Sequence, residues 1–157
     1  MIILGIDPGL AAIGYGVIDT NGKQPVAIAW GTIKTDKDQP HPARLTEIQS
    51  CMAELLATFN PDAASIEKMI FQSRSFGQKT SEARGVIIAA LQLAGIPIHE
   101  YTPQQAKESA YGDGRASKME VQQAMQLHLG LESHPKPNHA ADALALAFTY
   151  FARGMTQ

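Results

Sequence analysis

The feature that most restricts the fold is an apolar run at the start of the chain, Ile2-Ile3-Leu4-Gly5-Ile6. A nearly continuous apolar strand is typical of burial on both faces, because a strand with one exposed face alternates apolar and polar residues. Asp7-Pro8-Gly9 follows and ends the run in a turn. We therefore expect this strand to lie in a sheet that is covered on both sides.

Two more strands are predicted close behind the first, over residues 13–19 and 25–33. Between them stands Thr20-Asn21-Gly22, and Asn-Gly readily adopts the positive φ angles of a tight hairpin turn. Strands joined by such short connections pair in an antiparallel manner. The first three strands should thus form an antiparallel meander.

Helices and strands alternate along the rest of the chain, as apolar spacing and cap residues indicate. Capping boxes are predicted at Thr102 with Gln105 and at Ser117 with Glu120. The expected elements are a helix from Leu45 to Phe59 stopped by Asn60-Pro61, a strand over 62–67, a helix over 80–94 stopped by Gly95, a strand over 96–101, two short helices opened by the capping boxes, and a last helix capped by Asn138 and reaching about Phe151. This order predicts an α/β fold with a mixed five-stranded sheet flanked by helices.

The composition is that of an ordinary globular protein, with 157 residues of which 45% are hydrophobic and 18% charged. This length suits one core, so residues 1–157 are expected to form a single domain. The single cysteine, Cys51, excludes an internal disulfide and fits a reducing cytosol. The apolar run before Asp7 is too short for a signal peptide or a membrane span. We expect a protein of the cytoplasm without a membrane partner.

The net charge of −2 lacks the basic footprint that nucleic-acid-binding proteins usually carry. The charge is unevenly distributed, however, because residues 68–118 hold seven Lys or Arg against four Asp or Glu, a local +3. The rest of the chain sums to −5. Basic charge is therefore concentrated in the middle third of the chain, which keeps a nucleic-acid partner in consideration.

Two acidic residues stand at strand ends that we expect to meet. The helix between the first and fourth strands is the crossover that parallel pairing requires, so these strands should be parallel neighbours about 4.8 Å apart. Asp7 and Glu67 would then lie side by side at the carboxyl edge of the sheet. Two adjacent carboxylates repel each other unless one holds a proton or a cation lies between them.

The last helix contributes His139 and Asp142, which are three residues apart and so share one face of its first turn. Taken singly, Asp7 is more simply a turn former, Glu67 a solvated strand end and His139 a helix-start residue. Taken together, the carboxylates and a neutral imidazole fit Mg²⁺ or Mn²⁺. Two such metal sites about 4 Å apart are a known arrangement for the attack of water on a phosphodiester.

Five short motifs stand in order along nearly the whole chain. They are Ile3-Leu4-Gly5-Ile6-Asp7-Pro8-Gly9, Gly14-Tyr15-Gly16, Ile66-Glu67, Ala83-Arg84-Gly85-Val86 and His139-Ala140-Ala141-Asp142-Ala143-Leu144-Ala145. Together they closely resemble the motifs of the RuvC family of bacterial Holliday-junction resolvases. The resemblance implies a ribonuclease H-like fold and a homodimer that binds a four-way DNA junction during DNA recombination and repair, together with the RuvA–RuvB branch-migration complex.

The resemblance further implies a metal-dependent endonuclease. Each subunit would nick one of two opposing strands and leave 5′-phosphate and 3′-hydroxyl ends, with two Mg²⁺ per active site for which Mn²⁺ can substitute. The metal-binding catalytic set would be Asp7, Glu67, His139 and Asp142. Many family members carry Asp where this chain has His139, so a neutral metal ligand or a base here replaces an anionic ligand.

The resemblance also assigns basic residues to catalysis and to DNA. Lys107 and Lys118 match positions near the scissile phosphate, where they either stabilise the transition state or hold the backbone. On composition alone, two solvated lysines would be the simpler interpretation. The DNA-contacting basic residues would be Arg74, Lys79, Lys107, Arg115 and Lys118.

Residues 68–76 resemble the loop with which the family probes the junction centre. Phe71, or else Phe76, would stack there on an unpaired base. The alternative is that Phe71 packs in the core and Phe76 staples the next helix. Small residues in the helix over 80–94, which lies in the family's dimer interface, fit either a second copy or packing within the chain.

Three rival functions fit parts of the pattern. Gly5-Ile6-Asp7-Pro8-Gly9 resembles the phosphate loop of an actin-like or sugar-kinase ATPase, but such proteins need two domains and a Gly-rich adenosine loop, and this sequence has no such loop. A non-catalytic junction-binding protein would not need Asp7, Glu67 and Asp142. Another ribonuclease H-like nuclease, acting on an RNA–DNA hybrid, would differ only in its substrate.

Overall fold

The computed structural model describes residues 1–69 and 77–154, which form five strands and five helices. In chain order these are β1 (Ile2–Asp7), β2 (Ala12–Asp19), β3 (Val26–Lys34), α1 (His41–Phe59), β4 (Ala63–Glu67), α2 (Gly77–Leu93), β5 (Ile98–Tyr101), α3 (Pro103–Tyr111), α4 (Lys118–His128) and α5 (Asn138–Gly154). The strands make one sheet in the order β3-β2-β1-β4-β5. The prediction of an α/β fold with a five-stranded sheet is confirmed.

The strands pair as the sequence indicates. The pairs β1–β2 and β2–β3 are antiparallel, whereas β1–β4 and β4–β5 are parallel. Ile6 of β1 lies opposite Ile66 of β4. The next residues, Asp7 and Glu67, therefore end neighbouring strands at the same edge of the sheet. The predicted meander and the predicted parallel neighbours are both confirmed.

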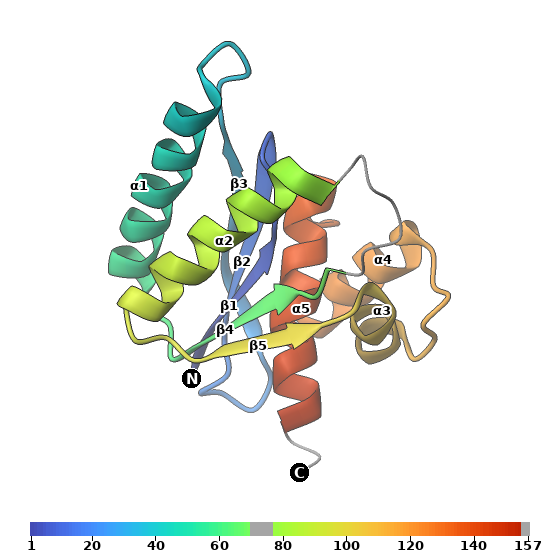
Figure 1. Ribbon diagram of the computed structural model, residues 1–157. Coiled ribbons are helices and arrows are strands. Elements are labelled where there is room, and N and C mark those ends of the chain that lie inside the picture. The colour runs from blue at the N-terminus through green and yellow to red at the C-terminus, as the bar shows by residue number, and fades with distance from the viewer. Residues whose placement is uncertain (70–76, 155–157) are drawn as a thin grey trace.

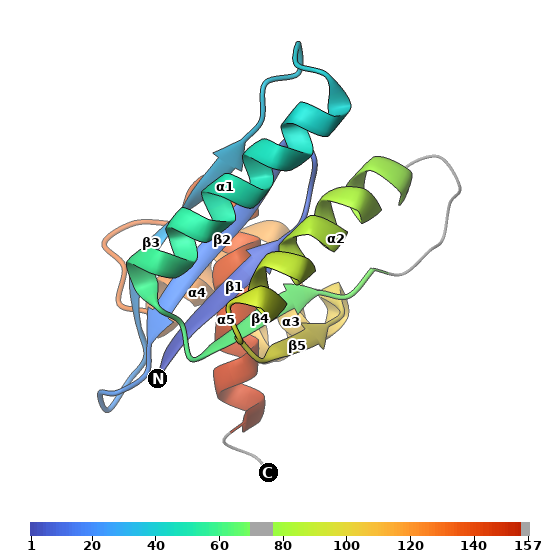
Figure 2. The same cartoon turned by 60° about the vertical axis from the view of Figure 1, so that its left-hand side comes forward.

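The central strand β1 contributes to a separate core on each face of the sheet. Helices α1 and α2 cover one face, and α5 with α3 and α4 covers the other (Figures 1 and 2). Leu4 and Ile6 pack with side chains of α1 and α2, whereas Ile3 packs with side chains of α4 and α5. These three side chains are at most 1% exposed. Burial on both faces, predicted from the apolar run, is thus confirmed.

Helix α5 lies directly against the sheet because two glycines leave room for it. A Cβ on Gly5 would lie 1.9 Å from the carbonyl oxygen of Ala143, and a Cβ on Gly14 would lie 1.9 Å from the carbonyl oxygen of His139. Gly14 is also the register partner of Asp7. The missing side chain at Gly14 therefore lets the first turn of α5 lie beside the carboxyl end of β1.

Both predicted capping boxes form, at Thr102 with Gln105 and at Ser117 with Glu120. Other boundaries differ: α1 begins at His41 because Pro42 fits the first helical turn, α2 begins at 77 and β5 at 98. Across residues 1–69 and 77–154, no helix is long and apolar enough to cross a membrane.

Two local predictions are wrong. Asn21 and Gly22 do not have positive φ angles, and β2 is joined to β3 by the six residues 20–25 rather than by a tight turn. Asn21 is held instead by hydrogen bonds to Asp19 Oδ1, at 2.8 Å from its backbone N–H and 2.7 Å from its side-chain amide. Asn138 is the first residue of α5 rather than its cap, and its Oδ1 accepts a hydrogen bond from Gln122 at 2.8 Å.

Candidate active site

The four side chains predicted to bind metal come from three elements that meet at one edge of the sheet. Asp7 ends β1, Glu67 ends β4, and His139 and Asp142 lie near the start of α5. Figure 1 shows the arrowheads of β1 and β4 beside α5. Each of these carboxyl groups feels the charge of at least one other, so the structure brings the acidic set together.

Asp7 and His139 are in direct contact. His139 Nδ1 lies 2.7 Å from Asp7 Oδ2. An ionised carboxylate only accepts hydrogen bonds, so with Asp7 ionised a neutral imidazole donates from Nδ1 and keeps its lone pair on Nε2. The Asp7 side chain is 13% exposed and the His139 side chain 55% exposed, which makes the imidazole the solvent-accessible member of the pair.

Burial and mutual repulsion raise the pKa values of the carboxyl groups. For Glu67, burial and then the charges of Asp7 and Asp142 raise the pKa from 4.5 to about 7. Burial also raises the pKa of Asp7, against the lowering effect of its hydrogen bond with His139. Burial, followed by the charge of Asp7, raises the pKa of Asp142. The cluster is therefore short of positive charge, a condition that a bound cation relieves.

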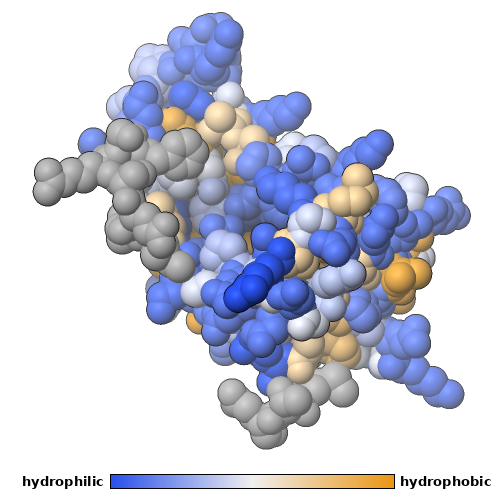
Figure 3. All heavy atoms as spheres, turned by 90° about the vertical axis from the view of Figure 1, so that its right-hand side faces the viewer, coloured by the Kyte–Doolittle hydropathy of each residue, from blue (hydrophilic) through white to orange (hydrophobic). Residues whose placement is uncertain are grey.

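A cavity of about 310 Å³ opens beside the carboxylates and connects them with both predicted lysines. Its polar lining comprises Glu67, Asp142, Lys107 and Lys118, and its apolar walls come from α3, α4 and α5. Lys118 directly follows the Ser117 cap of α4. Figure 3 shows that this side of the molecule is mostly hydrophilic, with some apolar patches. The two lysines thus face the space next to the acidic pair.

A second cavity, of about 640 Å³, shares His139 with the site. It is lined by the turn over 8–12 that follows Asp7, by Arg44 of α1 and by residues 78–80 of α2. Lys79, a predicted DNA contact, therefore lies next to the site. Sequence reasoning missed Arg44, which precedes the apolar pattern of α1 and belongs to none of the five motifs.

The remaining predicted DNA contacts are not joined to the site by the structure. Arg115 lies in the exposed connection between α3 and α4 and lines neither cavity, while its backbone N–H donates to Asp113 Oδ1 at 2.9 Å. Phe71, Arg74 and Phe76 lie outside the described residues.

Arg84 supports the end of β4, a role that its motif alone did not indicate. Its guanidinium forms an ion pair with Glu100 of β5, and its Nε donates to the backbone carbonyl of Glu67 at 3.4 Å. Only 17% of the Arg84 side chain is exposed. Arg84 therefore ties α2 to the carboxyl ends of two parallel strands and steadies the backbone that carries Glu67.

The donor set fits a hard divalent cation, although it is not closed around one point. Within residues 1–69 and 77–154, no three His, Cys, Asp or Glu side chains surround a common point closely enough to hold an ion as they stand. Asp7 directly contacts His139, and the charge of Asp7 raises the pKa of Glu67 after burial does. Carboxyl oxygens predominate among the donors, as Mg²⁺ requires. An arriving cation would compete with the protons that the raised pKa values retain.

Comparison with known proteins agrees with the geometry. The family described as "Crossover junction endodeoxyribonuclease RuvC" matches residues 3–150. Proteins of that name from Brevibacillus brevis and from a Synechococcus strain are 45% and 44% identical to this chain. The first alignment covers 96% of this chain and 91% of the relative, and the second covers 95% and 97%.

Solved structures extend the agreement to three dimensions. Thermus thermophilus RuvC matches with a TM-score of 0.91 at 33% identity, and T. thermophilus RuvC in complex with Holliday junction substrate matches with 0.89 at 30%. Both matches cover 99% of this chain and 96% of the other. The yeast mitochondrial Holliday junction resolvase Ydc2, with a TM-score of 0.69 at 13% identity over 96% of this chain and 77% of its own, shares the fold alone. The predicted ribonuclease H-like fold and the predicted resemblance are confirmed, and this chain belongs to the RuvC family of crossover junction endodeoxyribonucleases.

Proposed function

We propose that this protein resolves Holliday junctions in DNA recombination and repair by metal-dependent hydrolysis of one phosphodiester in each of two opposing strands, leaving 5′-phosphate and 3′-hydroxyl ends. Family membership makes the chain an endodeoxyribonuclease. The observation that carries the mechanism is the convergence of Asp7, Glu67 and Asp142 beside a cavity that also contains Lys107 and Lys118.

Asp7, Glu67, Asp142 and His139 would hold the divalent cation. The oxygen-rich donor set favours Mg²⁺, two per active site, and the imidazole makes Mn²⁺ an effective substitute. When bound, the metal would lower the pKa of a water and offset charge on the phosphate. Because the pKa of Glu67 is about 7, this residue would exchange a proton for the cation near neutral pH.

The contact with Asp7 determines which atom of His139 is available. With Asp7 ionised and the imidazole neutral, Nδ1 is occupied by its hydrogen bond to Oδ2, and Nε2 retains the lone pair. Nε2 can then ligate the cation or accept a proton from the attacking water. The same tautomer serves both roles, so Asp7 positions His139 for either of them.

Lys107 and Lys118 act near the phosphate that reacts. Burial raises the pKa values of Asp7 and Asp142, and the charge of Lys118 partly opposes this at both residues, as that of Lys107 does at Asp142. Positive charge this close to the carboxylates supports a role in stabilising the negative charge that develops on the phosphate in the transition state.

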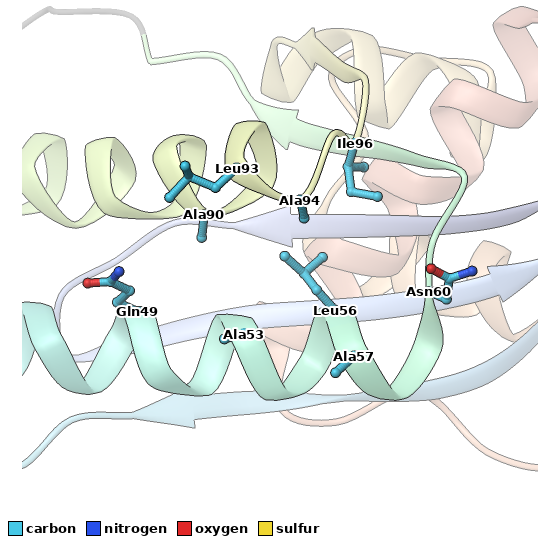
Figure 4. A pocket seen from close by; sticks show the side chains of 9 residues that line it. All are labelled: Gln49, Ala53, Leu56, Ala57, Asn60, Ala90, Leu93, Ala94 and Ile96. Atoms are coloured by element: carbon cyan, nitrogen blue, oxygen red, sulfur yellow. The ribbon is translucent and has the colours of Figure 1, made fainter.

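A second copy of the chain would supply the second active site. A mostly apolar groove of about 380 Å³ lies between α1 and α2. Figure 4 shows its lining side chains, with Leu56 on α1 and Leu93 on α2. Leu93 is 83% exposed in one copy, and a Cβ on Gly85 of α2 would meet nothing within 4 Å. We assign this face to a homodimer interface. Ala83, one of the small residues of the predicted helix over 80–94, is fully buried in the chain's own core.

Three further parts of the proposal rest on the family. These are the partnership with the RuvA–RuvB branch-migration complex, a location in the bacterial cytoplasm, and a single nuclease domain formed by residues 1–157. The roles of Phe71 or Phe76 at the junction centre and of Arg74 and Arg115 on phosphate likewise rest on the motif match.

The test is cleavage of a labelled four-way DNA junction beside linear duplex and RNA–DNA hybrid, with Mg²⁺, Mn²⁺ or EDTA. We expect paired symmetric nicks in the junction alone, lost in EDTA and in Asp7→Asn, which should still bind the junction. Cutting of the hybrid instead would keep the metal chemistry and replace the substrate. Tight junction binding without cleavage in either metal would refute the catalytic role of the acidic cluster.

A further inference from the structure

The cavity that shares His139 with the active site is cationic. Among the residues that the structure describes, its lining includes two positively charged side chains, Arg44 and Lys79, and no Asp or Glu. The cavity beside Lys107 and Lys118 differs, because Glu67 also lines it. An anion entering the His139 cavity therefore meets positive charge without a lining carboxylate to repel it.

Arg44 is oriented by a chain of hydrogen bonds within the protein. Its Nε donates to Thr35 Oγ1 at 2.8 Å, and the Thr35 hydroxyl donates to the carbonyl oxygen of Leu10 at 2.7 Å. Thr35 is only 8% exposed, so this hydroxyl is a fixed anchor. A guanidinium held through Nε still offers Nη1 and Nη2 as a planar fork for an oxyanion.

The fork of Arg44 is not used by the chain itself. Across the described residues, the Arg44 side chain makes no hydrogen bond or ion pair other than the one to Thr35. Within the part of the chain that the structure describes, Glu82 of α2 makes no ion pair with Arg44, because its carboxylate contacts His41 and accepts a hydrogen bond from Gln78 at 3.1 Å. Arg44 is thus a cation in a fixed orientation, and its Nη1 and Nη2 can bind a ligand.

We propose that Arg44 and Lys79 bind a DNA backbone phosphate adjacent to the scissile one, and that Thr35 positions Arg44 for this contact. The inference rests on the proposed junction cleavage. Residues 8–12, which follow Asp7 directly, line the cavity, and Leu10 among them anchors Thr35. One short segment therefore sets the distance between the acidic cluster and the phosphate fork. A strand held there on one side and by Lys107 and Lys118 on the other would be fixed on both sides of the reacting bond.

The test compares wild type with Arg44→Gln, and with Lys37→Gln as a control of equal charge change at an exposed residue that lines neither cavity. Junctions would carry a single neutral methylphosphonate at each phosphate near the cut in turn. We expect Arg44→Gln to raise Kd and KM about tenfold with kcat within about twofold, and to reduce the slope of log Kd against log salt by about 0.9. One methylphosphonate next to the cut should weaken junction binding by wild type to the same extent. It should cause no further loss of affinity in Arg44→Gln.

The role of Thr35 has its own variants. Thr35→Val should raise KM, as Arg44→Gln does, whereas Thr35→Ser, which keeps the hydroxyl, should have the KM of wild type. Melting curves would establish that both variants fold. The inference is overturned if Arg44→Gln behaves like Lys37→Gln, if the methylphosphonate losses add to that of Arg44→Gln at every position, or if kcat falls instead of KM rising. Failure of wild type to bind or cleave any junction would overturn the proposed function itself, which keeps the two failures distinct.

Discussion

Replacing Glu67 by Gln should stabilise the metal-free protein at neutral and alkaline pH. The folded chain raises the pKa of Glu67 from 4.5 to about 7, first by burial and then by the charges of Asp7 and Asp142. Each pKa unit corresponds to about 1.4 kcal/mol, so the full cost of ionising this carboxyl in the fold is about 3.4 kcal/mol. Glu67 remains partly exposed, and solvent screening reduces our expectation to about 1–2 kcal/mol.

The pH dependence of stability that Glu67 causes is opposite to that of a salt-bridged carboxylate. The folded state binds the Glu67 proton more tightly than the unfolded state, so the free energy of unfolding falls as pH rises from 4.5 to about 7. The destabilisation is complete above that window and largely absent at pH 5. A neutral Gln removes it at every pH, so the variant and wild type should diverge only as pH rises.

Thermal melts in EDTA at pH 5 and pH 8 measure the effect. For 157 residues, 1–2 kcal/mol corresponds to a rise in Tm of about 2–8 °C for Glu67→Gln at pH 8. Glu54→Gln, which removes the same charge from the exposed side of α1, serves as the matched control. Mg²⁺ should raise the Tm of wild type more than that of Glu67→Gln. Equal Tm values for wild type and Glu67→Gln at pH 8, or an equal gain at pH 5, would refute the reasoning.

Three other substitutions test separate parts of the structure. Lys118→Ala should lower kcat about a hundredfold and weaken junction binding only about twofold; equal losses in single-turnover cleavage and in gel-shift affinity would reduce Lys118 to a backbone contact. Gly14→Ala should cost about 1–3 kcal/mol and much of the activity, because its Cβ would meet the His139 carbonyl oxygen at 1.9 Å, and an unchanged melting curve would contradict this. Leu93→Glu should dissociate the homodimer without lowering the monomer's Tm, since Leu93 is 83% exposed, and a dimer that persists in light scattering would place the interface elsewhere.

The acidic part of the site was predictable because every step depended on local signals. The apolar run before Asp7 identified a buried strand, and the helical spacing between Leu45 and Phe59 identified the crossover that makes β1 and β4 parallel. Parallel neighbours end at the same edge, so the meeting of Asp7 and Glu67 followed from topology alone. The capping boxes at Thr102 and Ser117 were predictable for the same reason, since both partners lie within four residues.

The predictions that failed depended on partners that are distant in the chain or that compete locally. Asn21 and Gly22 have the propensity for a tight turn, but Asp19 accepts two hydrogen bonds from Asn21. The N-terminal amine also donates a hydrogen bond to Asn21 Oδ1 at 2.7 Å. These contacts favour a longer connection without positive φ angles. Asn138 likewise had the right chemistry for a cap, yet Gln122 of α4 occupies its oxygen.

The cationic cavity lined by Arg44 and Lys79 shows why short sequence motifs do not identify every functional residue. Asp7 is visible in the sequence because it ends a strand. Arg44 is oriented through Thr35, 9 residues away in the chain, and Thr35 is in turn held by Leu10, 25 residues from it. The same holds for the pairing of Asp7 with His139 across 132 residues, which requires Gly14 to have no side chain. Residues that supply charge can be read from local pattern, but residues that orient charge are defined by the packing of α1 and α5 against the turn after β1. Variants of the second kind should therefore alter KM, tautomer or register, and those at Thr35 and Arg44 leave all five motifs intact.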